Sequence, residues 1–125
     1  MAKFYICRHC GNQVEMISSS GVPVMCCGRK MELLEPNTVE ASGEKHLPAV
    51  NLRDDIVEVN VGSVDHPMVD EHYIEWVALE TDKGVFRKHL HPGQPPHVSF
   101  ALGGDKAVAV YAYCNLHGLW KTVLK

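Results

Sequence analysis

The chain has 125 residues, of which 46% are hydrophobic, and its 12 basic and 15 acidic residues give a formal net charge of −3. This hydrophobic content is normal for a globular protein, and the acidic excess argues against a nucleic-acid partner or an acidic membrane surface. No stretch approaches the roughly 18 apolar residues that a membrane span requires, and Cys7 comes too early for a secretory signal peptide. We therefore expect a cytoplasmic protein, whose cysteines stay reduced and more often bind metals than form disulfides.

The sequence divides into three blocks. Residues 1–36 contain four of the five cysteines and one predicted short strand, at 14–17. Residues 37–43 are small and polar and are expected to form a linker. Residues 44–125 form the main domain. Because a chain below about 40 residues usually needs a metal or disulfides to fold, the first block is predicted to be a metal-stabilised module.

The main domain contains many short strands. Two segments, 56–61 and 72–81, are predicted strands. In the first, Val57, Val59 and Val61 are expected on one face. In the second, Ile74, Trp76 and Ala78 are expected on the face opposite Tyr73, Glu75, Val77 and Leu79. Further strands are predicted at 85–90, 97–102, 106–113 and 119–124. Turn sequences separate the strands and helical periodicity is absent, so the fold is expected to be mainly β, with an antiparallel sandwich.

The first four cysteines form a CxxC pair and an adjacent pair: Cys7, Cys10, Cys26 and Cys27. Four thiolates can complete a tetrahedral site for one metal. Two adjacent ligands require local distortion, because one peptide unit has to span two corners of the tetrahedron. The spacing predicts metal binding and leaves iron and zinc equally open; a zinc ribbon and a strained disulfide between the adjacent cysteines are the alternatives. His9 is expected to be an exposed loop residue.

The fifth cysteine, Cys114, lies three residues before His117. Four thiolates saturate the first metal, so Cys114 is free, buried or bound to a second metal. A CxxH motif alone is a weak signal, and an inert buried cysteine is the simpler interpretation of it. Three further histidines, His46, His66 and His72, lie where a turn begins or a strand ends. Together with the CxxH motif they favour a second metal site.

Four motifs of the main domain occur in a characteristic order. They are Glu44-Lys45-His46-Leu47-Pro48, Gly62-Ser63-Val64-Asp65-His66-Pro67-Met68, His72-Tyr73-Ile74-Glu75-Trp76 and Tyr113-Cys114-Asn115-Leu116-His117-Gly118. These motifs resemble those of desulfoferrodoxin, the two-iron superoxide reductase. The cysteines of the first block resemble those of the desulforedoxin module at the N-terminus of that family. The resemblance extends over nearly the whole chain.

The resemblance implies a rubredoxin- or desulforedoxin-like module with one iron and four cysteine ligands at residues 1–36, a linker at 37–43 and an immunoglobulin-like antiparallel β-sandwich at 44–125, usually as a homodimer. It implies two iron ions per chain. The ligands of the first iron would be Cys7, Cys10, Cys26 and Cys27, and those of the second four equatorial histidines, His46, His66, His72 and His117, with Cys114 as the axial ligand. The backbone amides of Leu116 and His117 are expected to donate hydrogen bonds to the Cys114 sulfur. His89, His91 and His97 match no ligand position and are expected in loops.

The implied activity is that of a superoxide reductase, an oxidoreductase that reduces superoxide to hydrogen peroxide in the response to oxidative stress. The electron would come from an external donor such as a rubredoxin. A dismutase is the nearest competing activity, but a thiolate favours ferric iron and makes it a poor oxidant of superoxide. A non-catalytic iron electron-transfer protein and a zinc-ribbon-like interaction module also remain open. The first iron is either a relay or structural.

Glu44 and Lys45 directly precede the predicted ligand His46. The resemblance places both on a mobile loop over the open position of the second site. There Lys45 would attract the anionic substrate and help to organise protonating water, and Glu44 would close the position after the product leaves. The alternative is a solvated surface pair of little energetic consequence.

Overall fold

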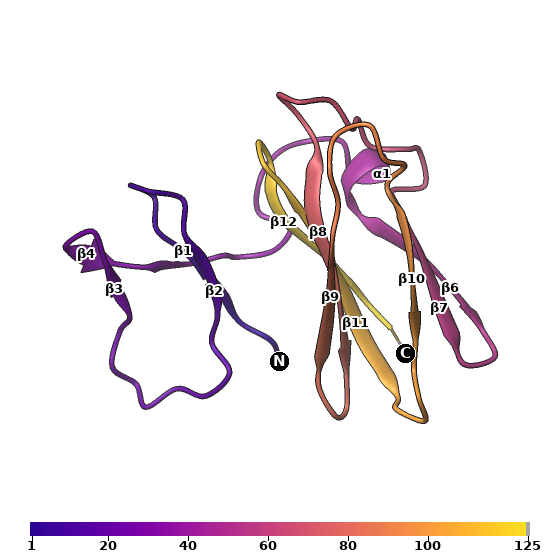
Figure 1. Ribbon diagram of the computed structural model, residues 1–125, viewed down its shortest axis with the longest axis horizontal. Coiled ribbons are helices and arrows are strands. Elements are labelled where there is room, and N and C mark those ends of the chain that lie inside the picture. Colours follow the sequence, from indigo (N-terminus) through magenta and orange to yellow (C-terminus); the bar gives the residue numbers. More distant parts are fainter. Residues whose placement is uncertain (125) are drawn as a thin grey trace. The chain divides into compact units, whose positions relative to one another are not determined.

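The computed structural model describes residues 1–124 and separates the chain into two compact units, Met1–Glu35 and Pro36–Lys125 (Figure 1). Both units consist of short antiparallel strands, and within residues 1–124 the one helix is a single turn, α1 (Gly43–His46). The predicted mainly-β fold is therefore confirmed. No helix among these residues has the length and apolar character needed to cross a membrane.

The first unit is built from two small sheets. One has the order β2-β1-β5, and β3 and β4 form a separate hairpin. Their bounds are β1 (Phe4–Ile6), β2 (Gln13–Glu15), β3 (Met25–Cys26), β4 (Arg29–Lys30) and β5 (Glu32–Leu33). The strand expected at 14–17 ends at Glu15, and Ile17 is 92% exposed. The buried hydrophobic side chains of this unit are few: Phe4, Ile6, Cys7, Met31 and Leu34.

The second unit contains two antiparallel sheets, with the orders β10-β7-β6 and β12-β11-β8-β9 (Figure 1). The first sheet consists of β6 (Pro48–Arg53), β7 (Ile56–Val61) and β10 (His97–Ala101). The second consists of β8 (Ile74–Thr81), β9 (Val85–His89), β11 (Ala107–Cys114) and β12 (Gly118–Val123). The sequence analysis predicted no strand at residues 48–53, so it missed β6 in this unit.

The core of the second unit consists of side chains from both sheets. Val57, Val59 and Val61 of β7 belong to it, as predicted, and each is at most 1% exposed. The prediction for β8 is wrong at one position, because Ile74 shares the core with Val77 and Leu79 rather than with Trp76 and Ala78. The pairing of β8 with β11 shifts register between Tyr113 and Cys114. Such an irregularity moves the following residues to the other face of the strand.

Residues 37–42 lie within the second unit. The backbone amide of Asn37 donates to the carbonyl of Leu119, at 3.0 Å. Its side chain also bonds the backbone of Lys121 twice, with Oδ1 accepting from the amide at 2.9 Å and Nδ2 donating to the carbonyl at 3.1 Å. Asn37 has φ 62°, a left-handed conformation that asparagine tolerates better than most residues. These bonds attach the start of the unit to β12.

Candidate metal centres

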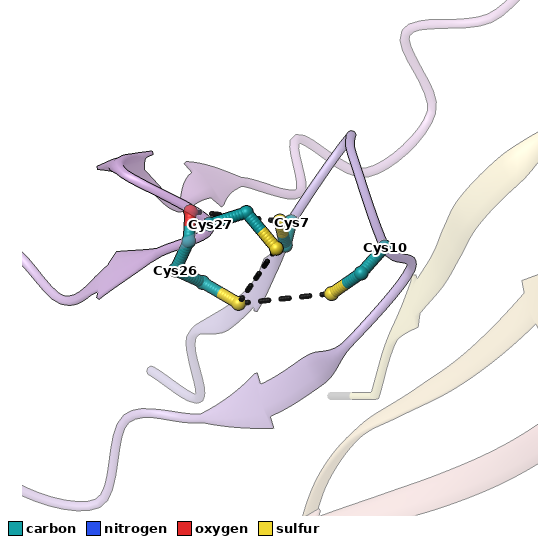
Figure 2. Close-up of side chains that lie close together, drawn as sticks. All are labelled: Cys7, Cys10, Cys26 and Cys27. Carbon is teal, nitrogen blue, oxygen red and sulfur yellow. Dashed lines mark hydrogen bonds between the residues drawn. The ribbon is translucent and has the colours of Figure 1, made fainter.

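The four N-terminal cysteines converge on one point (Figure 2). Their sulfur atoms all lie within 4.8 Å of one another, with Cys10 Sγ 3.7 Å from Cys26 Sγ and Cys26 Sγ 4.0 Å from Cys27 Sγ. A tetrahedral site with metal–sulfur bonds of about 2.3 Å has sulfur–sulfur edges of about 3.8 Å. All four cysteines are free, and the adjacent pair is far from the roughly 2.05 Å of a disulfide bond. The donor set therefore fits a metal.

The adjacent pair adopts the distortion that its spacing predicted. Cys27 has φ 53°, in the left-handed region, directly after β3. In an extended strand, neighbouring side chains point to opposite faces, whereas this conformation turns Cys26 and Cys27 toward the same point (Figure 2). The chain backbone thus places two consecutive sulfurs in one site.

The pKa values of the clustered cysteines also favour a bound cation. Hydrogen bonds from the backbone amides of Cys10 and His9 lower the pKa of Cys7 to about 6. Hydrogen bonding with the Cys10 side chain is the largest cause that raises the pKa of Cys27, to about 12, and that of Cys26. Four thiols at these distances cannot all be anionic by themselves. A bound cation would stabilise all four thiolates at once.

Four imidazole rings of the second unit form a closed square. Neighbouring rings have centroid separations of 4.5 Å (His46–His66), 4.6 Å (His66–His72), 5.1 Å (His72–His117) and 4.9 Å (His46–His117), with interplanar angles between 78° and 83°. The diagonal pair His46–His72 is farther apart, at 6.2 Å. This is the arrangement expected of four equatorial ligands around one ion.

Hydrogen bonds orient two of these rings toward a common centre. His46 Nδ1 lies 2.7 Å from the carbonyl of Ser42, and His66 Nδ1 lies 2.7 Å from the carbonyl of Pro67. A carbonyl only accepts, so each Nδ1 carries the proton and each Nε2 carries a lone pair. The two Nε2 atoms are nevertheless 3.1 Å apart. Two lone pairs cannot bond each other, so this contact fits a shared cation.

The other two rings agree with this interpretation. His117 Nδ1 lies 3.1 Å from His46 Nε2. His72 Nε2 is the one buried side-chain nitrogen or oxygen within residues 1–124 that has no hydrogen-bond partner. Burial lowers the pKa of His46 and His72 and brings that of His66 to about 4. These three rings are therefore neutral at neutral pH, the form in which imidazole binds a metal.

Cys114 completes the second donor set. It is the last residue of β11, is fully buried, and its sulfur lies 3.9 Å from His117 Nδ1. The ligand atoms of His46, His72, Cys114 and His117 all lie within 4.8 Å of one another, and His66 adjoins them through His46. Burial raises the pKa of Cys114, whereas the amides of His117 and Leu116 lower it by donating to the sulfur, from His117 at 3.4 Å. The predicted hydrogen bond from the His117 amide is confirmed, and the one from the Leu116 amide stays a prediction.

Close backbone packing positions His46. Glu44 O accepts hydrogen bonds from Val64 N, at 2.9 Å, and from Ser63 Oγ, at 3.2 Å. A Cβ atom on Gly62 would lie 2.5 Å from Glu44 O. Because only glycine permits this approach, α1 lies directly on the segment that leads to His66.

Trp120 supports two of the ligands from β12. Its ring stacks on His46 with a centroid separation of 4.8 Å, and its Nε1 donates to the carbonyl of His117 at 3.1 Å. The sequence analysis did not name Trp120, and it named Gly62 as part of a motif without assigning it a role. A tryptophan three residues after a CxxH motif was the available signal.

Glu44 and Lys45 are exposed on α1, a helical turn where a loop was expected. After burial and the neighbouring histidines, the Lys45 charge is a further cause of the lowered pKa values of His46 and His72. The positive charge of Lys45 thus acts on two imidazoles of the second donor set.

The three remaining histidines of this unit lie outside the donor set. His89 ends β9, His97 begins β10 and His91 lies in the loop between them, and all three are exposed. The expectation of loop positions is therefore wrong for His89 and His97. His97 Nε2 contacts Asp65 Oδ1 at 3.1 Å. His9 of the first unit is exposed, as expected.

Comparison with known proteins places these centres in a family. The family model described as desulfoferrodoxin matches residues 38–123. The chain is 43% identical to a desulfoferrodoxin of Nitratidesulfovibrio vulgaris over 95% of this chain and 94% of that protein. It is also 43% identical to a desulfoferrodoxin homolog of Archaeoglobus fulgidus, over 94% of each.

Solved structures agree with the sequence comparison. The crystal structure of the superoxide reductase from Treponema pallidum matches with a TM-score of 0.81 and 38% identity, over 98% of both chains. A superoxide reductase from Giardia intestinalis matches 66% of this chain, with a TM-score of 0.55 and 31% identity. The described residues contain both donor sets that the family's two iron centres require, one of four cysteines and one of four histidines and a cysteine. The chain belongs to the desulfoferrodoxin family.

Proposed function

We propose that this protein is a superoxide reductase. It would catalyse the reaction of one superoxide, one electron and two protons to one hydrogen peroxide. The observation that carries the proposal is the group of four imidazoles and one buried cysteine sulfur, in which Nε2 of His46 and Nε2 of His66 face each other across 3.1 Å. An electron carrier needs only the four-cysteine centre, and so does a zinc-ribbon-like module. Neither function explains the group of histidines around Cys114.

The ligand assignment follows from the two donor sets. We propose that Cys7, Cys10, Cys26 and Cys27 hold one iron, and that His46, His66, His72, His117 and Cys114 hold the other. Four neutral imidazoles and one thiolate would leave a ferrous ion with a net charge of about +1, which attracts an anion. When bound, this iron supplies the electron that superoxide accepts.

The protein itself contributes orientation and charge. The carbonyls of Ser42 and Pro67 hold two rings in the tautomer that leaves Nε2 free. The amide of His117 donates a hydrogen bond to the Cys114 sulfur and so moderates its electron donation. We propose the same role for the amide of Leu116. We propose that Lys45 attracts the anionic substrate and orients protonating water, and that the Glu44 carboxylate would be a further ligand available to the iron in the absence of substrate.

The remaining assignments rest on the family resemblance. Residues 1–36 would form the module with the four-cysteine iron centre, residues 37–43 would link it to the reductase domain at 44–125, and the protein would be a homodimer. A rubredoxin-like protein would supply the electrons, and the four-cysteine centre would be structural. Five free cysteines suit the reducing cytoplasm, where we place the protein.

The stoichiometry of peroxide formation tests the proposed activity. A reductase supplied with an external reductant forms one hydrogen peroxide per superoxide consumed and releases no oxygen. A dismutase forms one hydrogen peroxide and one oxygen from two superoxides. Pulsed superoxide with the reduced, iron-loaded protein, followed by peroxide and oxygen measurement, separates the two. Oxygen release without consumption of reductant would exclude the proposal.

Lys45→Ile is expected to slow the second-order reaction with superoxide by about tenfold or more. One positive charge at roughly 6–8 Å from the substrate, in an effective dielectric of about 20–40, contributes about 1–3 kcal/mol. The same change should flatten the dependence of the rate on ionic strength, because the attraction is screened by salt. Pulse radiolysis across a salt series measures both quantities.

Lys83→Ile is the matched control, because it removes the same charge from an exposed turn. Lys83 follows β8 at the end opposite His72, roughly 25 Å along the strand. Glu44→Ala, on the same turn as Lys45, is expected to leave the rate nearly unchanged and to alter the ferric absorption band. If Lys45→Ile leaves the rate and its salt dependence unchanged, Lys45 is a solvated surface residue with no role in the reaction.

A further inference from the structure

Asn115 lies between Cys114 and His117 and reaches across to the segment that carries His72. Its side-chain Oδ1 accepts from the backbone amide of Tyr73 at 2.9 Å, and its Nδ2 donates to the carbonyl of Glu71 at 3.0 Å. Its own amide donates to the carbonyl of Tyr73 at 3.2 Å. The residues on both sides of His72 are therefore bonded to one side chain.

These bonds begin where the sheet ends. The regular pairing of β11 with β8 shifts register after Tyr113 and reaches its last pair at Cys114 and Ile74. Beyond this pair, the backbone bond from the Asn115 amide to the Tyr73 carbonyl is followed by the two bonds of the Asn115 side chain. A carboxamide has the donor and the acceptor of a peptide group, so Asn115 continues the connection for residues that the ladder cannot reach.

The side chain of His72 does not fix its own position through hydrogen bonds of its Nε2 atom. Within residues 1–124 this atom is buried without a hydrogen-bond partner, as expected of a metal-ligand atom. The backbone of His72 pairs with Val69 through bonds of 3.0 and 3.1 Å, which attach it to its own loop. Of these contacts, the Asn115 bonds alone connect the His72 segment to the Cys114–His117 turn.

We propose that Asn115 is a positioning residue that holds His72 in register with Cys114 and His117, so that the four imidazoles can bind one metal ion. The proposal rests on the ligand assignment given above. Asn115 acts through the backbone of Glu71 and Tyr73 rather than through contact with the substrate. Its loss should therefore weaken metal binding at the second centre before it affects the fold.

Asn115→Ala is expected to lower the affinity of the second centre for ferrous iron by about tenfold or more, because residues that support a metal ligand typically contribute about 10–100-fold. The full chain would be equilibrated anaerobically with ferrous iron and a competing chelator, then oxidised. The charge-transfer bands of the two centres and total iron give the occupancy of each. The four-cysteine centre should load normally. The measurement needs no superoxide, so it stands even if the proposed activity is wrong.

Asn37→Ala is the matched control. Asn37 also makes two side-chain hydrogen bonds to backbone groups far away in the sequence, but to Lys121, which flanks no ligand. Its φ of 62° adds a backbone cost that Asn115→Ala lacks. Asn115→Asp is the second variant, since it keeps an acceptor for Tyr73 N and places an oxygen against the carbonyl of Glu71.

The outcomes divide clearly. A loss of affinity at least about fivefold larger in the Asn115 variants than in Asn37→Ala, with thermal unfolding no worse, supports the positioning role. A smaller difference overturns it. Failure of both Asn115 variants to fold, while Asn37→Ala folds, also overturns it, because Asn115 would then support the sheet rather than the site.

Discussion

Cys114→Ser is expected to abolish superoxide reduction while the absorption of the four-cysteine centre stays intact. Cys114 is the one sulfur donor in the second group, and the four imidazoles alone would not favour the ferric state in the same way. Removing a residue that merely supports a ligand already costs about 10–100-fold, so loss of the ligand itself should exceed about a hundredfold. Superoxide decay after pulse radiolysis, with metal analysis of the same sample, measures the effect.

Ala112→Ser is the control for the buried hydroxyl. Ala112 lies two residues earlier on β11, is fully buried, and belongs to the same core as Cys114. It therefore tests the cost of a serine in this part of the sheet without touching a donor atom. We expect Ala112→Ser to retain most of its activity. Near-normal activity in Cys114→Ser would refute the assignment of the second centre, and equal loss in both variants would attribute the effect to packing.

Cys10→Ser is expected to unload the first centre and to unfold residues 1–35 locally. The Cys10 side chain is exposed, so the substitution removes little packing and mainly a metal ligand. The first unit has five buried hydrophobic side chains within residues 1–35, too few to fold so short a chain without a metal. Amide hydrogen exchange should show loss of protection in this unit and none in the second.

The reductase activity of Cys10→Ser should remain when a chemical reductant supplies the electrons. His9→Ser, an exposed neighbour in the same turn, is the control and should keep both the iron and the protection. If activity disappears while the second iron remains fully loaded, the first centre is an obligatory relay and its proposed structural role is wrong.

The sequence predicted the chemistry of both centres better than their geometry. The spacing of the CxxC pair and of the adjacent pair is visible in the sequence. The four sulfurs of the first site could therefore be grouped without knowledge of the fold. The order of the histidine and cysteine motifs likewise indicated a family. Strand alternation predicted the core face of β7, because the period of two is a local property of the chain.

The tertiary structure decided everything that depends on partners distant in the sequence. The register shift opposite Cys114 placed Ile74 in the core, against the local alternation. The carbonyls of Ser42 and Pro67 selected the tautomers that leave two lone pairs facing each other, and Gly62 allowed α1 to lie on the segment before His66.

The support of the second site could not be predicted for the same reason. Trp120 stacks on a ring 74 residues earlier in the numbering, and Asn115 bonds residues more than 40 positions away. Sequence patterns report what one residue type does within its own strand or turn, whereas these contacts exist only after segments distant in the sequence have come together in the fold. The sequence by itself therefore determined which donors are present, and only the folded chain decided how they face one another.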